Sequence, residues 1–136
     1  MKVRIDNENI DFLKMINDIN SKKNGAIVTF IGTVRDENNG KNVKKIIYDA
    51  YFPMAIQEME NVCKESIEKF GILDVNVHHR IGEFYPGETV LFIAVSSAHR
   101  EEGFNACRYI IDKIKERVPI WKKEFYEDSS AWIIPP

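Results

Sequence analysis

The chain contains few of the residues from which disulfide frameworks and metal centres are built. Its 136 residues include two cysteines, Cys63 and Cys107, and three histidines. The cysteines form no Cys-x-x-Cys pair, and the histidines lack the spacing of metal ligands. Because both cysteines lie among apolar neighbours in helix-like patterns, we interpret them as buried thiols of a cytoplasmic protein. We expect no metal and no cofactor.

Long apolar segments and an excess of positive charge are also missing. The longest apolar run is far shorter than the roughly 20 residues that span a bilayer, and the N-terminus has no apolar signal-peptide core. A net charge of −2 argues against a general nucleic-acid binder. With 44% hydrophobic and 29% charged residues, the composition is typical of a globular protein. We therefore expect one domain over residues 1–136, with no membrane and no nucleic-acid partner.

Hydrophobic periodicity predicts alternating helices and strands. Helices are expected at 8–20, 53–70 and 100–117, and strands at 26–35, 43–51, 73–80 and 89–95, with short terminal strands at 121–126 and 131–134. The third helix is predicted to bury Phe104, Cys107, Ile110, Ile111 and Ile114. Residues 36–42 are polar and rich in turn formers, and they predict a mobile loop.

The order of these elements predicts an α+β fold with a largely antiparallel sheet packed against helices. The short connection at 81–88 favours a hairpin between the strands at 73–80 and 89–95. His78 and His79 are interpreted as structural, one facing the core and one exposed, because neighbours on a strand point to opposite faces. Composition and periodicity predict no particular reaction.

A group of cations brackets the third helix. The apolar strand before it stops at two serines, and His99 and Arg100 follow where the helix begins. A guanidinium, an imidazole and free helix N–H groups together make an anion site. Lys115 and Lys122 flank the Val-Pro-Ile-Trp corner after the helix. On a chain that is not basic overall, these cations indicate a small anionic substrate.

Each of these residues also has a purely structural interpretation. Lys115 falls on the flank of the apolar stripe, where a lysine stem often covers the edge of a core. Lys122 and Lys123 alternate on a strand, so at most one of them lines a given pocket. Arg35 precedes a polar loop, where arginines are often solvated, and His99 is also suited to a backbone contact at the helix end.

Four sequence blocks, spread over about residues 25–124, stand out as motifs. They are Gly25-Ala26-Ile27-Val28-Thr29-Phe30-Ile31-Gly32-Thr33-Val34-Arg35, His79-Arg80-Ile81-Gly82-Glu83 followed by Pro86-Gly87-Glu88, Ser97-Ala98-His99-Arg100, and Pro119-Ile120-Trp121-Lys122-Lys123. In sequence, order and spacing these blocks resemble the family of the large, catalytic subunit of molybdopterin synthase.

The resemblance implies an α/β-hammerhead fold, a homodimer and an enzyme. It implies sulfur transfer to cyclic pyranopterin monophosphate, which builds the dithiolene of molybdopterin. The sulfur would come from the Gly-Gly thiocarboxylate of a small ubiquitin-like carrier, giving a heterotetramer with the homodimer. The family's functional positions fall on two groups of residues: Lys115 and Lys122 for catalysis, and Arg35, His99, Arg100, Phe30 and Ile111 for substrate binding.

Two questions stay open at the level of sequence. The family's tail supplies a further arginine, whereas this chain ends Trp132-Ile133-Ile134-Pro135-Pro136 without a cation. The rival to the sulfurtransferase is a non-catalytic scaffold that binds a ubiquitin-like tail. Such a scaffold needs one or two lysines, so the full cation set favours the enzyme. A lysine crowded by arginines would have a lowered pKa and would serve as a base or nucleophile.

Overall fold

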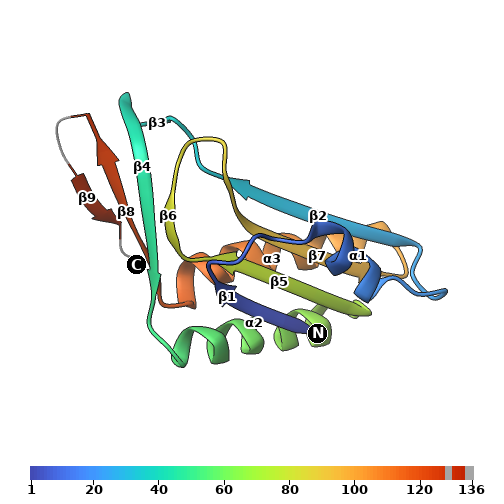
Figure 1. Ribbon diagram of the computed structural model, residues 1–136. Helices are drawn as coiled ribbons and strands as arrows, with labels where there is room; N and C mark the ends of the chain where they lie inside the picture. The colour runs from blue at the N-terminus through green and yellow to red at the C-terminus, as the bar shows by residue number, and fades with distance from the viewer. Residues whose placement is uncertain (128–129, 134–136) are drawn as a thin grey trace.

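The computed structural model describes residues 1–127 and 130–133, with side chains described for 1–127, and consists of two sheets and three helices (Figure 1). The elements in chain order are β1 (Lys2–Asp6), α1 (Phe12–Ile19), β2 (Ala26–Thr33), β3 (Glu37–Asn38), β4 (Lys41–Ala50), α2 (Met54–Phe70), β5 (Asp74–Arg80), β6 (Gly82–Phe84), β7 (Thr89–Ser97), α3 (Arg100–Arg117), β8 (Ile120–Tyr126) and β9 (Ser130–Ile133).

The first sheet has the strand order β1-β5-β7-β2. Strand β1 is parallel to β5, and the other neighbours are antiparallel, with Val77 opposite Ile93 and Val28 opposite Val95. Helices α2 and α3 pack on one face and α1 packs on the other. Because both faces are covered, every residue of β7 after Thr89 is buried.

The main core lies between α2, α3 and the first sheet. Met59 and Ile110 come from the two helices and meet Val75 and Ile93 from the sheet, and all four are fully buried. At roughly 25 cal/mol per Å² of apolar surface, each such side chain stabilises the fold by about 1.5–3 kcal/mol relative to exposure.

The second sheet is built on the long strand β4. Strands β3, β6 and β8 pair with β4, and β9 pairs with β8 (Figure 1). Strand β8 follows α3 almost directly. Pro119 has no N–H to continue the helix, and its carbonyl accepts from the N–H of Tyr51 at 3.1 Å. The C-terminal end of α3 is thereby fixed beside the end of β4.

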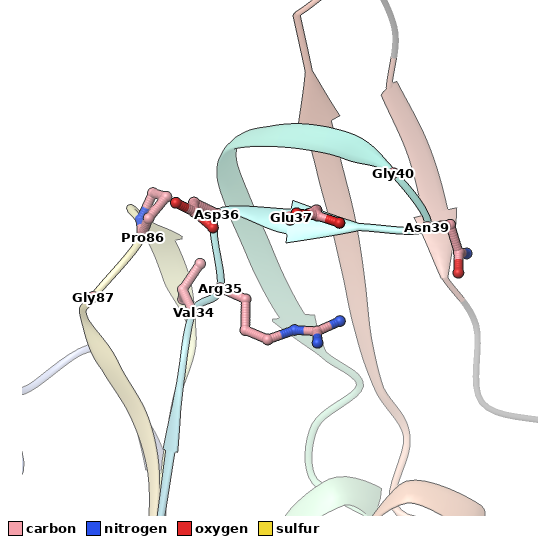
Figure 2. A pocket seen from close by; sticks show the side chains of 8 residues that line it. All are labelled: Val34, Arg35, Asp36, Glu37, Asn39, Gly40, Pro86 and Gly87. Carbon is pink, nitrogen blue, oxygen red and sulfur yellow. The ribbon is translucent and has the colours of Figure 1, made fainter.

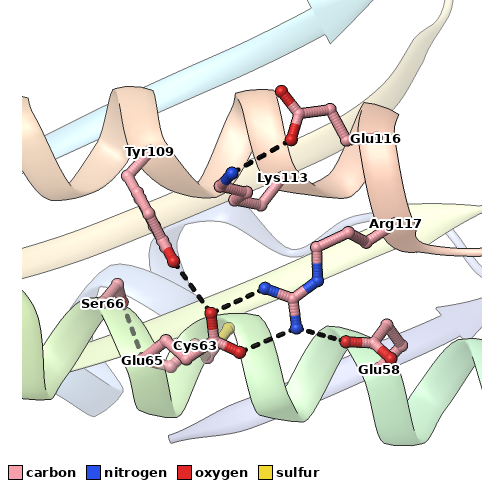
Figure 3. Close-up of polar contacts among 8 residues, drawn as sticks. All are labelled: Glu58, Cys63, Glu65, Ser66, Tyr109, Lys113, Glu116 and Arg117. Carbon is pink, nitrogen blue, oxygen red and sulfur yellow. Dashed lines mark hydrogen bonds and ion pairs between the residues drawn. The ribbon is translucent and has the colours of Figure 1, made fainter.

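A cluster of charged side chains joins the outer surfaces of α2 and α3 (Figure 3). The Arg117 guanidinium donates to both oxygens of Glu65, at 2.6 and 2.7 Å, and also to Glu58. The Tyr109 hydroxyl donates to Glu65 at 2.8 Å. These contacts, with that of Arg117 first, lower the pKa of Glu65 to about 2, and the two carboxylates raise the pKa of Arg117. The cluster holds the last turn of α3 against α2.

The α+β prediction is confirmed, and so are the antiparallel pairing of β5 with β7 and the burial of both thiols. The connection between β5 and β7 is nevertheless not a plain turn. Gly82 takes a φ of +125°, which only glycine adopts readily, and the chain then forms β6 against β4. Residues 36–42 are not an open loop either, since β3 and the start of β4 form a hairpin closed by Asn39 and Gly40 at positive φ.

Three further sequence predictions need correction. Phe104 is 61% exposed rather than buried. Both histidines are buried: His78 lies under α1 and bonds Asp6 at 2.7 Å, and His79 packs on Tyr48. The first helix begins at Phe12 rather than residue 8, because Asp11 caps it by accepting from the N–H of Lys14. The predicted last strand extended to residue 134, which lies outside the described residues.

Among the described residues, no helix is long and apolar enough to cross a bilayer.

Candidate anion site around the third helix

The connection from α3 to β8 carries the two candidate lysines. Lys115 lies in the last turn of α3 and is exposed. Lys122 is the third residue of β8, with 34% of its side chain exposed. The corner at Val118 and Pro119 between them is held by the Val118 N–H, which donates to the Ile114 carbonyl at 3.1 Å. The local sequence thus brings one helical and one strand lysine to the same end of α3.

Lys122 points to the face of the second sheet that carries Tyr48. The two residues are register partners, and the Lys122 ammonium lies 3.2 Å from a Glu124 oxygen. Lys123 lies on the opposite face, with its ammonium 5.2 Å from the centre of the Phe125 ring. The prediction that alternation separates the two lysines is therefore confirmed.

Glu124 is a buried carboxylate that sequence reasoning missed. It is 2% exposed and accepts from the Asn38 amide at 2.8 Å and the Tyr126 hydroxyl at 2.5 Å. Burial acts to raise the pKa of Glu124, but hydrogen bonds from Tyr126, Asn38 and Lys122 together lower it. Burial and the nearby Glu124 charge raise the pKa of Tyr48 to about 12. An ionised carboxylate therefore anchors the Lys122 ammonium.

Phe30 and Ile111 lie at the margin of the main core, where β2 meets α3. Both are half-buried and pack against the core rather than within it. Ile111 precedes Lys115 by one helical turn, so the two side chains share a face of α3. Of the two predicted apolar residues, Ile111 therefore adjoins the predicted lysine.

Arg35 lies just beyond the end of β2, where it lines an open hollow (Figure 2). The Val34 carbonyl accepts from the Gly87 N–H at 2.8 Å, so the base of the β3–β4 hairpin is tied to the turn before β7. In Figure 2 the Arg35 guanidinium extends away from Pro86 and Gly87. In the described part of the chain, neither Arg35 nor Lys115 has an ion-pair partner.

His99 and Arg100 lie at the opposite end of α3. The corner before them is tightly packed: a Cβ on Gly25 would lie 2.4 Å from the Ala98 carbonyl oxygen, so only glycine fits there. The Ser97 hydroxyl donates to the His99 carbonyl at 2.7 Å. The His99 side chain is 84% exposed and its Nδ1 lies 3.7 Å from Glu102.

One chain does not gather all the predicted site residues. The predicted residues Arg100 and Lys115 are 15 positions apart on one helix. At 1.5 Å per residue this separation is roughly 22 Å. Ile111, Lys115 and Lys122 lie toward the C-terminal end of α3, whereas His99 and Arg100 lie at its N-terminal end.

The site is composed of cations rather than metal ligands. Among the described residues, no group of three or more His, Cys, Asp or Glu is arranged to hold a metal ion. Ammonium and guanidinium groups bind phosphates and carboxylates, and a buried carboxylate beside a lysine fixes where that charge lies. The arrangement suits an anionic substrate and an acyl group with a negative charge.

Solved structures that match this fold include proteins of molybdopterin biosynthesis. The structure of molybdopterin synthase from Staphylococcus aureus matches with a TM-score of 0.90 and 37% identity, covering 96% of this chain and 95% of that chain. A molybdopterin cofactor biosynthesis protein E from Burkholderia multivorans matches with a TM-score of 0.84 and 29% identity, covering 98% and 88%. The fold is therefore that of this class of biosynthetic proteins.

Relatives found by sequence are similar over most of this chain, and they are catalytic subunits of molybdopterin synthase. The molybdopterin synthase catalytic subunit of Pyrococcus abyssi is 47% identical over 85% of this chain and 78% of its own length. That of Bacillus subtilis is 44% identical over 97% of this chain and 81% of its own length. Residues 5–117 match the family described as MoaE protein, and the chain belongs to that family.

Proposed function

We propose that this chain is the catalytic subunit of a molybdopterin synthase. It transfers sulfur from the C-terminal thiocarboxylate of a small ubiquitin-like carrier to cyclic pyranopterin monophosphate. The observation that carries the proposal is the pair of lysines at the α3–β8 corner, one exposed and one anchored by buried Glu124. The family membership of the chain supports the same reaction.

The two lysines have different surroundings and therefore different roles. Lys115 has no ion-pair partner in the described residues and is free to meet the thiocarboxylate of the carrier tail. Lys122 is fixed by Glu124 and holds a positive charge at a set place on the sheet. In each transfer a carbon–sulfur bond forms on the pterin side chain in place of a carbon–oxygen bond, and water cleaves the acyl–sulfur bond, which leaves the end of the carrier tail as a carboxylate. Two such transfers supply both sulfur atoms of the dithiolene.

The remaining predicted residues bind the substrate. Arg35, His99 and Arg100 provide cations for the phosphate, and Phe30 and Ile111 provide an apolar wall. Since roughly 22 Å separates Arg100 from Lys115 along α3, we assign each active site to two copies of the chain. The two-fold axis of a homodimer would place His99 and Arg100 of one copy beside the lysines of the other.

A carrier subunit completes the proposed assembly as a heterotetramer. A solved structure from Helicobacter pylori is described as a complex of subunits 1 and 2 of molybdopterin-converting factor. At 19% identity, with a TM-score of 0.76, this likeness is one of fold. We place the reaction in the cytoplasm, in keeping with two free buried thiols.

Turnover by alanine variants tests the proposal. Purified protein is incubated with thiocarboxylated carrier and cyclic pyranopterin monophosphate, and dithiolene product is measured. Lys115→Ala and Lys122→Ala should each lower turnover by at least about 100-fold. Lys115→Ala should unfold as wild type does, because this side chain is exposed and lies outside the core. Lys122→Ala should be less stable, because it leaves the buried Glu124 carboxylate without its ammonium partner, so its turnover is measured under conditions where the variant is folded. Lys123→Ala, on the opposite face of the same strand, is the matched control and should stay near wild type.

The same assay separates the enzyme from a scaffold. A wild-type protein that binds carrier but forms no dithiolene would establish the non-catalytic alternative. Near-wild-type turnover of both lysine variants, with folding intact, would refute the catalytic assignment of Lys115 and Lys122. Removal of the carrier's terminal Gly-Gly should abolish turnover, because the reacting group would no longer reach the lysines.

A further inference from the structure

The β3–β4 hairpin contacts the carboxylate of β8 that anchors Lys122. Asn38, in β3, donates from its side-chain amide to Oε2 of Glu124 at 2.8 Å. Tyr126 donates its hydroxyl to the same oxygen at 2.5 Å. The other oxygen, Oε1, faces the Lys122 ammonium at 3.2 Å. The two oxygens of Glu124 therefore have different partners: Oε2 accepts hydrogen bonds from the neutral donors, and Oε1 pairs with the Lys122 ammonium.

Two donors on one oxygen fix the plane of a carboxylate. A carboxylate turns easily about its last bond when a single contact holds it, and solvent replaces a lost donor when the group is exposed. Glu124 is 2% exposed, so a donor that is lost there is poorly replaced by solvent. The direction in which Oε1 points therefore depends on Asn38 and Tyr126.

We propose that Asn38 is a positioning residue for Lys122, acting through the buried carboxylate of Glu124. This inference rests on the proposed function of Lys122. Among the described residues, Asn38 contacts neither Lys115 nor Lys122. It orients the Glu124 carboxylate, and this carboxylate in turn fixes the position of the Lys122 ammonium. Tyr126 supports the same oxygen from within β8.

The hairpin begins two residues after Arg35, which lies three residues before Asn38. Its base is tied to the turn before β7 through Val34 and Gly87, and the two ladder pairs at its tip, from Glu37 to Asn42, hold Asn38 in place. One short segment therefore bears both a candidate phosphate ligand and the amide that orients the lysine anchor.

Within residues 1–127, whose side chains are described, few charged or titratable groups lie around Glu124. Lys122 and Tyr126 lie on its own strand and Tyr48 lies on β4. One contact further out, Lys41 lies 5.1 Å from the Tyr126 ring centre and His79 lies 5.0 Å from Tyr48, measured between ring centres. Asn38 is neutral, so its removal leaves this set of charges unchanged. What changes is a hydrogen bond that lowers the pKa of Glu124.

The test compares Asn38→Ala with Asn42→Ala in the intact protein. Asn42 is an exposed asparagine on the other arm of the same hairpin, and no side-chain hydrogen bond is found for it in the described residues. Loss of one donor to a charged group is expected to lower kcat about tenfold in Asn38→Ala. The acid limb of the kcat–pH profile should also move to higher pH, because the Glu124 carboxyl then protonates more readily.

A measurement without turnover makes the result independent of the reaction. In protein labelled with ¹³C at the glutamate side-chain carboxyl carbons, the Glu124 resonance should titrate at higher pH in Asn38→Ala than in wild type. Tyr126→Phe should shift it in the same direction, and Asn42→Ala should not. Tyr126→Phe keeps the ring and therefore tests the idea even if Asn38→Ala folds poorly.

The two hypotheses fail in different ways. If wild type makes no dithiolene, the proposed function fails, and a Glu124 titration shifted in Asn38→Ala would still support the anchoring of the carboxylate. If wild type is active but Asn38→Ala and Tyr126→Phe match Asn42→Ala in kcat, pH profile and Glu124 titration, Asn38 is not a positioning residue.

Discussion

Replacing His79 by glutamine is expected to flatten the pH dependence of the free energy of unfolding. His79 is 6% exposed, and its ring packs edge-on against Tyr48 with 5.0 Å between ring centres. Its Nδ1–H donates to the Arg80 carbonyl at 2.8 Å. Burial, more than any other cause, lowers the pKa of His79 to about 4. The folded protein therefore keeps this imidazole neutral at pH values where an unfolded chain protonates it.

The size of the effect follows from the two pKa values. The unfolded chain takes up the proton near pH 6.5, and the folded protein takes it up only near pH 4. The stability linked to neutral His79 is therefore complete above pH 6.5 and is lost as the pH falls toward 4. Each pH unit in this window is worth about 1.4 kcal/mol, so the loss between pH 6.5 and 5 is about 2 kcal/mol.

Urea unfolding at pH 7.5 and pH 5.0, at one protein concentration, measures this difference. His79→Gln keeps an N–H donor for Arg80 but cannot take up a proton. The variant should be less stable than wild type at pH 7.5 because the ring is lost, yet its stability should fall by about 2 kcal/mol less on going to pH 5.0. The lowered pKa values of Asp6, Glu65 and Glu124 act mainly at lower pH and are common to both proteins. Equal losses in the two proteins would refute a neutral, buried His79.

Three further predictions concern α3 and its ends. Arg100→Ala and Lys115→Ala, each nearly inactive alone, should regain part of the wild-type turnover when mixed and allowed to exchange subunits; heterodimers without activity would contradict a shared site. Gly25→Ala should lower the free energy of unfolding by about 1–3 kcal/mol, measured in urea, because its Cβ would meet the Ala98 carbonyl. Arg117→Ala should cost about 1–2 kcal/mol by the same measurement, and this cost should shrink at high salt if screened ion pairs carry it.

Elements with several periods of hydrophobic pattern were predictable from the sequence, and shorter ones were not. Helices α2 and α3 have four or more turns each, so their apolar stripes are unambiguous. Strands β3 and β6 have two and three residues, which is too short for any period to show. Strand β1 was missed although Val3 and Ile5 alternate with charged residues, which is a strand pattern.

The burial of Phe104 and of the two adjacent histidines was predicted wrongly because it depends on how helices and sheets pack on one another. Phe104 lies roughly 100° around the helix from the centre of the buried stripe, which small residues such as Gly103 and Ala106 fill where α3 approaches the sheet. For His78 and His79, alternation correctly places the neighbours on opposite faces. Both are buried because α1 covers one face and Tyr48 of the second sheet covers the other.

The candidate site was predictable in its cations but not in what holds them. Lys115 and Lys122 flank a recognisable helix end, and Lys122 two residues before Glu124 is a same-face pair on a strand. That spacing alone could have drawn attention to Glu124. Asn38 lies 86 residues from Glu124, and no local pattern connects the two. The contact exists because β4 pairs with β8 on one part of its length and with β3 on another, which brings Asn38 of β3 close to Glu124 of β8.

The exposed flank of α3 explains why one copy of the chain would be incomplete. Arg100, Phe104, Ile111 and Lys115 fall within about 60° of one another around the helix axis. Phe104 is 61% exposed there, and the preceding residue, Gly103, packs against Val28 of β2, which is an edge of the first sheet. A two-fold axis between residues 107 and 108 would set Phe104 against Ile111 of the partner subunit. The same register would bring Arg100 beside Lys115 of the partner subunit, so the apolar contact and the shared anion site require one and the same pairing.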